Sequence, residues 1–209
     1  MKKPEMLTLL LSKLHGQLPE SSEFHIKKSA EALVRKIPGG RQELGIPLVA
    51  YAPEYFFSFV MCIRIDVVED IFHLFSKSPT PHDRSMSTTT ITRLEYFTGG
   101  SKEIKVVTAE DVTAAISNLS ETITSKIIPF FDSNLSVQSL DQSVNGPKPG
   151  FDITRNPSGA MHSVILAHLA DNPDFRNIVD RHRAKMQLAS DTDHQFNSLV
   201  KHLESLKKT

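Results

Sequence analysis

The chain has no tryptophan, one cysteine, no net charge and no long hydrophobic run. With 24 basic and 24 acidic residues among 209, no overall field draws the protein to nucleic acid or to anionic lipid. No segment approaches the ~20 consecutive apolar residues that span a bilayer. Cys62 has no partner for an internal disulfide, which suits a reducing compartment. These absences predict a cytoplasmic protein with neither a nucleic-acid nor a membrane partner.

The motifs of common enzyme classes are also missing. The chain contains no Gly-x-Ser-x-Gly, Walker or dinucleotide-binding motif. Its nine histidines include no pair four residues apart, and there is no Cys-x-x-Cys knuckle. Cys62 lies in an apolar run, so we interpret it as a core residue rather than a reactive thiol. We therefore predict no catalytic residue, no metal and no cofactor.

What the sequence does contain predicts an N-terminal helix. Its apolar residues recur at helical spacing: Met6, Leu7, Leu10, Leu11 and Leu14. The two lysines before them resemble the start of a signal peptide, but the uninterrupted apolar core is very short and no small-x-small cleavage site follows. We expect an amphipathic helix that packs on the rest of the fold.

Five strand-like runs follow the first helix. They lie at residues 31–37, 42–51, 55–65, 87–97 and 103–107. Pro38-Gly39-Gly40 predicts a hairpin between the first two runs, and Pro47 makes the second an edge strand or breaks it. The almost continuous apolar content of the third run predicts a central strand that is buried on both faces.

Helix signals occupy most of the remaining chain. Asp66 and Glu69 have the spacing of a capping box and predict a short helix, followed by a polar loop at Ser76–Ser85. Thr108 is the expected N-cap of a longer helix that ends at Pro129. After a proline-rich joint, three further helices are expected at about residues 158–170, 173–188 and 191–207.

A run of strands followed by a run of helices is typical of an α+β fold. We predict an antiparallel sheet of about five strands, with the N-terminal helix and a C-terminal group of helices packed on it. We favour a single domain over residues 1–209, with a sheet part at 1–107 and a helical part at 108–209, because a long apolar strand needs a cover. A separate helical domain from residue 108 onward is the open alternative.

Three arginines lie within three different strand-like runs: Arg35, Arg64 and Arg93. Because alternate residues of a strand share one face, these side chains would form a cationic stripe on the solvent side of the sheet if the registers agree. Such a stripe suits an acidic partner surface or an anionic ligand. The alternative is three unrelated surface arginines. Tyrosines near strand ends are expected to rim this surface: Tyr51, Tyr55 and Tyr96.

The expected loop before the fourth strand places His82, Asp83 and Arg84 in sequence. Functional residues concentrate in loops, and these three offer a base, a carboxylate and a guanidinium. Adjacent side chains diverge, however, so a solvated loop is the plainer interpretation. Basic residues between Arg176 and Lys185 alternate with acidic ones, which is typical of an exposed helix face.

One part of the chain resembles known proteins. Residues 127–132 read Ile-Ile-Pro-Phe-Phe-Asp, and they follow a hairpin with paired glycines and a strand that ends in Arg-Ile-Asp. This combination, over Leu33 to Ala170, resembles small uncharacterised bacterial domains, some of which look like immunity proteins of toxin systems. The resemblance implies a protein partner and carries no catalytic residues.

Two functions from different classes are therefore open. The leading hypothesis is a non-enzymatic protein-binding domain, as an immunity-type inhibitor would be. The alternative is a small-ligand-binding protein or an enzyme of unfamiliar class, with its site between the sheet and the helices. A third possibility, nucleic-acid binding through Arg176 to Lys185, predicts steeply salt-dependent retention on DNA.

Overall fold

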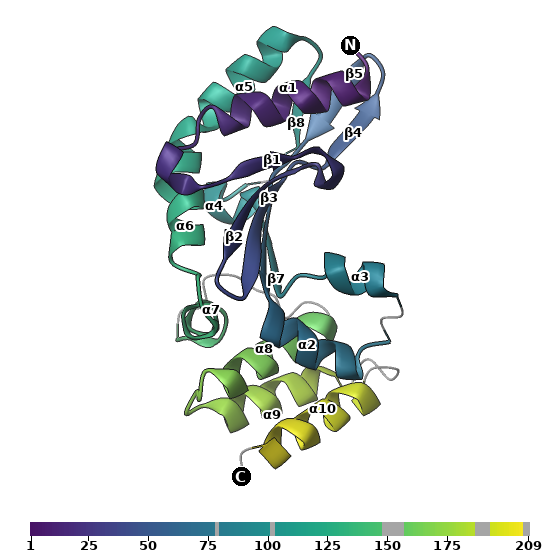
Figure 1. The fold of residues 1–209 in the computed structure, drawn as a ribbon, viewed down its shortest axis with the longest axis vertical. Helices are drawn as coiled ribbons and strands as arrows, with labels where there is room; N and C mark the ends of the chain where they lie inside the picture. The colour runs from purple at the N-terminus through teal and green to yellow at the C-terminus, as the bar shows by residue number, and fades with distance from the viewer. Residues whose placement is uncertain (78–79, 101–102, 148–156, 187–192, 207–209) are drawn as a thin grey trace. The chain divides into compact units, whose positions relative to one another are not determined.

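The computed structural model describes residues 1–77, 80–100, 103–147, 157–186 and 193–206. It has the predicted α+β fold, with helices and strands arranged in two compact units (Figure 1). Unit 1 consists of Met1–Ile63 and Ile91–Ser133, and unit 2 of Arg64–Thr90 and Asn134–Thr209. Neither unit is a continuous stretch of chain.

The strands form two sheets instead of one. The larger, sheet A, has five strands in the order β1-β2-β3-β6-β7 and the smaller, sheet B, has three in the order β4-β5-β8. The strands of sheet A are β1 (His25–Lys27), β2 (Ala32–Ile37), β3 (Gly40–Gly45), β6 (Val60–Ile65) and β7 (Thr90–Arg93). Those of sheet B are β4 (Leu48–Tyr51), β5 (Glu54–Phe57) and β8 (Ile104–Val106). The prediction of a five-stranded antiparallel sheet is confirmed.

Two of the predicted strands are each divided between the sheets. The chain leaves sheet A at Ile46-Pro47 to begin β4, and returns to it between β5 and β6. The prediction that 55–65 is one strand buried on both faces is wrong. In β6, buried Met61, Ile63 and Ile65 alternate with half-buried residues, because one face of this strand packs in the core and the other carries Cys62 and Arg64.

The core of unit 1 lies between the sheets and helices from both ends of its sequence. Helix α1 (Lys3–His15) buries its predicted apolar side and packs beside α5 (Ala109–Thr122), as Figure 1 shows. The Thr108 capping box is formed with Asp111. The prediction that the helix ends at Pro129 is wrong. A π-helical turn at Ile123–Ile127 follows α5, and Pro129 lies in the first turn of the next helix, α6 (Ile128–Asp132), where a proline is tolerated.

Short elements complete unit 1. Two 3₁₀ turns flank β1, at Glu20–Ser22 and Lys28–Ala30. The predicted strand at 87–97 is only partly correct, because β7 has four residues and is followed by the short helix α4 (Leu94–Thr98). The last β-branched residue of this segment is Thr92, so the strand signal stops close to where the helix begins.

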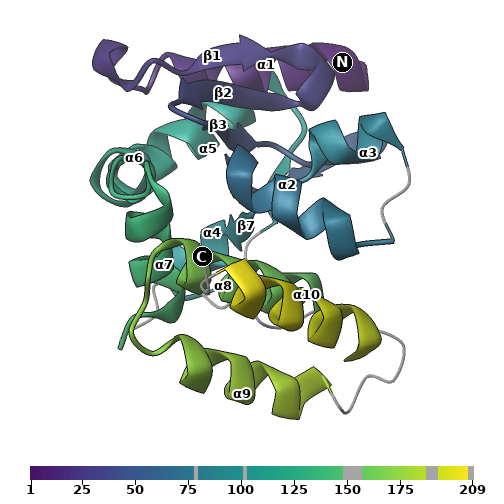
Figure 2. The same cartoon turned by 60° about the horizontal axis from the view of Figure 1, so that its bottom comes forward.

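Unit 2 is built around helix α8. Its helices are α2 (Asp66–Phe75), α3 (Pro81–Met86), α7 (Val137–Asn145), α8 (Pro157–Leu169), α9 (Phe175–Met186) and α10 (Asp193–Leu206). Helix α8 is apolar on nearly all sides and contacts α2, α7, α9 and α10, with α9 and α10 beside it in Figure 2. The three predicted C-terminal helices are confirmed. The sequence also predicts N-caps at Asn156 and Asn172, each followed by a proline. Asn156 lies outside the described residues, and α9 begins at Phe175, three residues after Asn172.

Two local predictions in unit 2 are wrong. The N-cap position of α2 is Ile65 rather than Asp66, and Glu69 is fully buried instead of closing a capping box. The expected polar loop at Ser76–Ser85 contains helix α3, which Thr80 caps by accepting a hydrogen bond from the Asp83 amide, 3.1 Å away.

Candidate functional site

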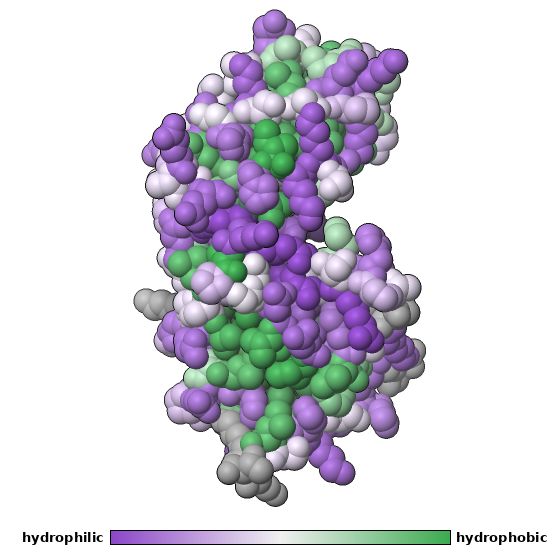
Figure 3. All heavy atoms as spheres, in the orientation of Figure 1, coloured by the Kyte–Doolittle hydropathy of each residue, from purple (hydrophilic) through white to green (hydrophobic). Residues whose placement is uncertain are grey.

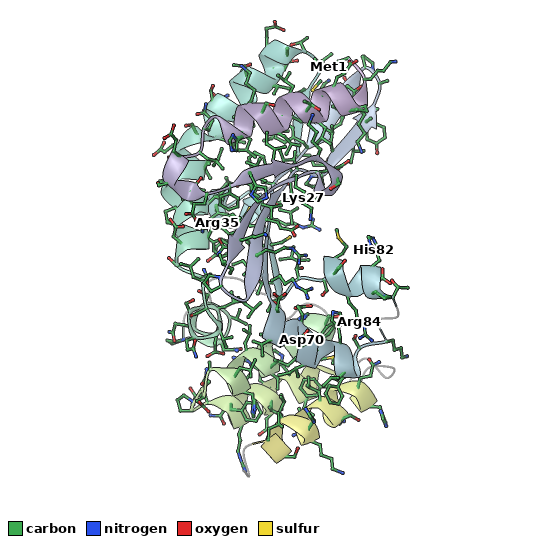
Figure 4. All side chains as sticks on the ribbon, in the orientation of Figure 1. Met1, Lys27, Arg35, Asp70, His82 and Arg84 are labelled. Atoms are coloured by element: carbon green, nitrogen blue, oxygen red, sulfur yellow. The ribbon has the colours of Figure 1, made fainter. Side chains whose placement is uncertain are left out.

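Arg35 does not belong to a solvent-facing stripe. Only 7% exposed, it donates to Gln42 Oε1 from Nε (2.9 Å) and Nη2 (2.6 Å), and from Nη1 to Asp132 Oδ1 (2.8 Å) and the Ser22 carbonyl (3.2 Å). Its guanidinium carbon also lies 4.9 Å from the centroid of the Phe24 ring. This predicted site residue is therefore a structural cation of unit 1, labelled in Figure 4. The predicted stripe does not form because Arg35 lies opposite Gln42 on the inner face of sheet A, where the two side chains are hydrogen-bonded.

The other two arginines of the predicted stripe lie in different environments. Arg93 is exposed on β7. The Arg64 side chain is 11% exposed and forms an ion pair with Asp66 at 2.6 Å. It also donates from Nη1 to the Arg84 carbonyl (2.6 Å) and to Ser87 Oγ (2.8 Å). Only Arg93 of the three keeps an exposed side chain.

The three tyrosines of the predicted rim differ in exposure. Tyr51 is 67% exposed, as a binding residue must be, and Tyr96 is half exposed, on α4 rather than at a strand end. Tyr55 is only 5% exposed, and its hydroxyl donates to the carbonyl of Met1, 2.7 Å away. The expectation that Tyr55 faces solvent is wrong, since its side chain points from β5 into the core below α1.

His82 and Arg84 are exposed on α3, where Figure 4 labels both. The carboxylate between them, Asp83, accepts a hydrogen bond from Thr80 Oγ1 at 2.5 Å as part of the helix cap. Asp83 is thus committed to the start of α3 and does not orient His82. The described contacts give this segment a structural role in holding a short helix.

Unit 2 contains a buried charged cluster that the sequence did not reveal. Glu69 is 0% exposed, with His162 Nε2 3.0 Å from its Oε1 and Thr89 Oγ1 donating to the same atom at 2.9 Å. Burial alone would raise the pKa of Glu69, but the hydrogen bond and charge of His162, with hydroxyl bonds from Ser87 and Thr89, lower this pKa to about 2. His73 Nε2 lies 3.7 Å from Glu69 Oε2.

The remaining reactive groups offer little chemistry. Burial, with the nearby Glu43 carboxylate, raises the pKa of the Cys62 thiol to about 12 against the opposing effect of Arg41, so this thiol stays protonated. Over the residues that the structure describes, no three His, Cys, Asp or Glu side chains converge to hold a metal ion. No described helix combines the length and the apolar character needed to cross a membrane.

The edge strands of the two sheets differ in the charge that they present to solvent. In the part of the chain that the structure describes, exposed cationic side chains lie on three of the four edge strands: Lys27 on β1, Arg93 on β7 and Lys105 on β8. Charged side chains at sheet edges oppose pairing with another chain. The fourth edge strand, β4, reads Leu-Val-Ala-Tyr and has no charge. Within the described chain, only β5 pairs with β4.

Strand β4 also presents apolar side chains to solvent. Val49 is 43% and Tyr51 67% exposed, and both lie on the face of sheet B that carries Phe56, whose ring centroid is 5.9 Å from that of Tyr51. Figure 3 shows apolar atoms among polar ones where Figure 1 places β4 and β5. We define Val49, Tyr51 and Phe56 as the sheet B patch. Together with the edge of β4, it is the candidate binding site.

The sequence analysis found one residue of this site and missed the others. Tyr51 was predicted. Val49 lies in the run that we predicted to be an edge strand or to be broken at Pro47, but no site was assigned to it, and Phe56 lies in the run that we interpreted as buried on both faces. The available signal was a four-residue uncharged strand between Pro47 and Pro53. Comparison with protein families, with curated proteins and with solved structures finds no match to this chain.

Proposed function

We propose that the chain is a protein-binding domain that accepts an extended segment of a partner protein along β4. The observation that carries the proposal is the uncharged edge of β4, in a protein whose three other sheet edges carry an exposed lysine or arginine. Alternate residues of an edge strand direct their backbone N–H and C=O groups away from the neighbouring strand, so a partner segment can extend the sheet.

The sheet B patch supplies the side-chain part of this recognition. Because a strand added to β4 alternates its side chains, every second one would lie beside Val49 and Tyr51. Cross-strand pairs of aromatic and β-branched residues contribute ~0.2–1 kcal/mol each. We expect the partner segment to carry such residues at alternate positions. A cytoplasmic toxin domain is the partner class that the resemblance to immunity proteins implies.

The experiment selects peptides from a phage library of random twelve-residue sequences on the whole chain and measures their affinity by fluorescence anisotropy. We expect the double variant V49K/Y51K to weaken binding at least tenfold. The matched control is I91K, which places a lysine at another exposed apolar position, 54% exposed on β7. This control should change the affinity less than twofold.

N-methylated versions of a selected peptide test the backbone pairing. Methyl groups along one edge of the peptide should abolish binding, whereas methyl groups along the other edge should leave it intact. Peptides that are insensitive to both methylation and V49K/Y51K would contradict strand addition. A concentration-dependent dimer in sedimentation that V49K/Y51K breaks would assign the edge to a second copy of the chain instead.

A further inference from the structure

The two faces of sheet A differ in charge. Residues directly opposite each other on neighbouring strands point to the same face. Lys27 of β1 lies opposite Ala32 of β2, and Lys36 of β2 lies opposite Arg41 of β3. Ala32 and Lys36 are four residues apart in β2, so they point to the same face. Arg35 is the neighbour of Lys36 in β2, and adjacent residues of a strand point to opposite faces, so buried Arg35 points to the other, inner face. The outer face of sheet A therefore carries Lys27, Lys36 and Arg41.

Strands β6 and β7 extend this outer face. A Cβ placed on Gly45 would lie 4.0 Å from the Cβ of Val60, so Val60 shares the face of Gly45, Glu43 and Arg41, and Cys62, two residues further along β6, lies on that face as well. In β7, buried Thr90 and Thr92 alternate with exposed Ile91 and Arg93, which places the exposed pair on the outer face.

The cations of this face are not neutralised within the sheet. Glu43 is its acidic residue, and it is already ion-paired with Arg41. Lys27, Lys36 and Arg93 are exposed, and among the described residues they have no ion-pair partner. A positive surface thus lies on a chain whose formal net charge is zero. Ile91, 54% exposed, lies within it.

The composition of the face indicates the class of ligand. Among its described outward residues the one aromatic ring is that of His25, opposite Val34, and there is no Phe, Tyr or Trp on which successive nucleic-acid bases could stack. Exposed Ile91 suits an apolar group, which a phosphate backbone does not provide. The distance from β1 to β7 is about 19 Å at ~4.8 Å per strand, which an extended peptide of about six residues spans.

We propose that the outer face of sheet A binds an acidic polypeptide segment that alternates carboxylates with apolar residues. Lys27, Lys36 and Arg93 pair with the carboxylates, and Ile91 contacts the apolar side chains. This surface is distinct from the edge of β4, so either proposal can fail without the other. The electrostatic share of the binding falls as salt rises, because the cations are exposed.

A fluorescein-labelled ten-residue peptide of alternating glutamate and valine tests the proposal by anisotropy. We expect saturable binding that K27E/K36E/R93E weakens at least tenfold. The matched control, R176E/R181E/K201E, reverses three exposed cations of unit 2 and changes the net charge equally. It should weaken binding less than threefold, as should V49K/Y51K. The three single variants and circular dichroism guard against misfolding of the triple variant.

Three results would overturn the proposal. The first is no saturable binding of the peptide up to millimolar concentration. The second is an equal loss of affinity in the two charge-reversal variants, which would mean that only bulk charge matters. The third is tighter binding of a ten-nucleotide thymidine strand than of the peptide, which would assign the face to nucleic acid.

Discussion

Each unit buries a charged side chain, and the two units neutralise it with different chemistry. In unit 1 the Arg35 guanidinium is held by an amide, a carbonyl and a carboxylate. In unit 2 the Glu69 carboxylate is held by His162 and Thr89, with His73 nearby. A guanidinium stays charged at every pH that a protein survives, whereas histidine titrates near neutrality. The polar core of unit 1 is therefore fixed, and that of unit 2 depends on pH.

The sharpest test of this comparison is Arg35→Ala. Removal of the guanidinium takes its hydrogen bonds away from Gln42 Oε1 and the Ser22 carbonyl inside unit 1, and each buried acceptor that loses its donor costs ~1–3 kcal/mol. Hydrogen exchange of the β2 and α6 amides measures the loss. The matched control is Asp132→Asn, whose side chain is 54% exposed and should cost less than ~1 kcal/mol. Equal losses in both variants would show that the ion pair, not the buried network, matters.

Acidification should destabilise unit 2 before unit 1. Burial lowers the pKa of His73; the Glu69 carboxylate opposes this, and the Arg84 and Arg64 guanidiniums add to it. A group with a lowered folded-state pKa contributes stability that is present above its unfolded pKa and lost as pH falls. The loss from His73 should therefore begin as pH falls below about 6.5. Glu69, with a pKa lowered from 4.5 to about 2, adds a loss below pH 4.5.

Hydrogen exchange of α2 and α8 between pH 7.5 and 5 measures this effect, with α1 and β2 as internal references. His73→Gln should flatten the pH dependence of unit 2 over this range. The control His82→Gln replaces an exposed histidine of the same unit and should leave that dependence unchanged. Unit 1 amides that lose protection together with those of unit 2 would contradict the assignment to the Glu69 cluster.

The smallest expected difference concerns two helix caps. Thr108→Ala removes the cap of α5, which has buried residues in the core of unit 1, and should cost about 1 kcal/mol in urea unfolding. Thr80→Ala removes the equivalent cap of α3, which buries no residue, so the global stability should change by less than ~0.5 kcal/mol. A larger cost at Thr80 would mean that α3 contributes to the core of unit 2.

Local patterns predicted most of the helices correctly. The apolar spacing of α1 and the capping box at Thr108 act within a few residues, so they can be recognised without the fold. Pro81 and Thr80 carried an equally local signal for α3, which we interpreted as loop because of the surrounding polar residues. The helix α3 was therefore missed although its start signal is present in the sequence.

The strands were predicted in position but not in partnership. Nothing within 42–51 or 55–65 shows that each run divides into two strands. In sheet A, β3 from the first run lies beside β6 from the second, and in sheet B, β4 lies beside β5. The candidate site was missed for the same reason. Whether Val49 is core or surface depends on which strand lies beside β4, and pairing is a property of residues that are distant in sequence.

The sequence by itself determined that this chain folds as strands followed by helices, with a capped α5. It could do so because propensity, spacing and capping involve neighbouring residues. Only the tertiary structure decided which charges are buried. Arg35 and Asp132 are separated by 97 positions, and Glu69 meets His162 from a different helix. A charged residue becomes core or surface through the partner that the fold brings to it, and no local pattern specifies that partner.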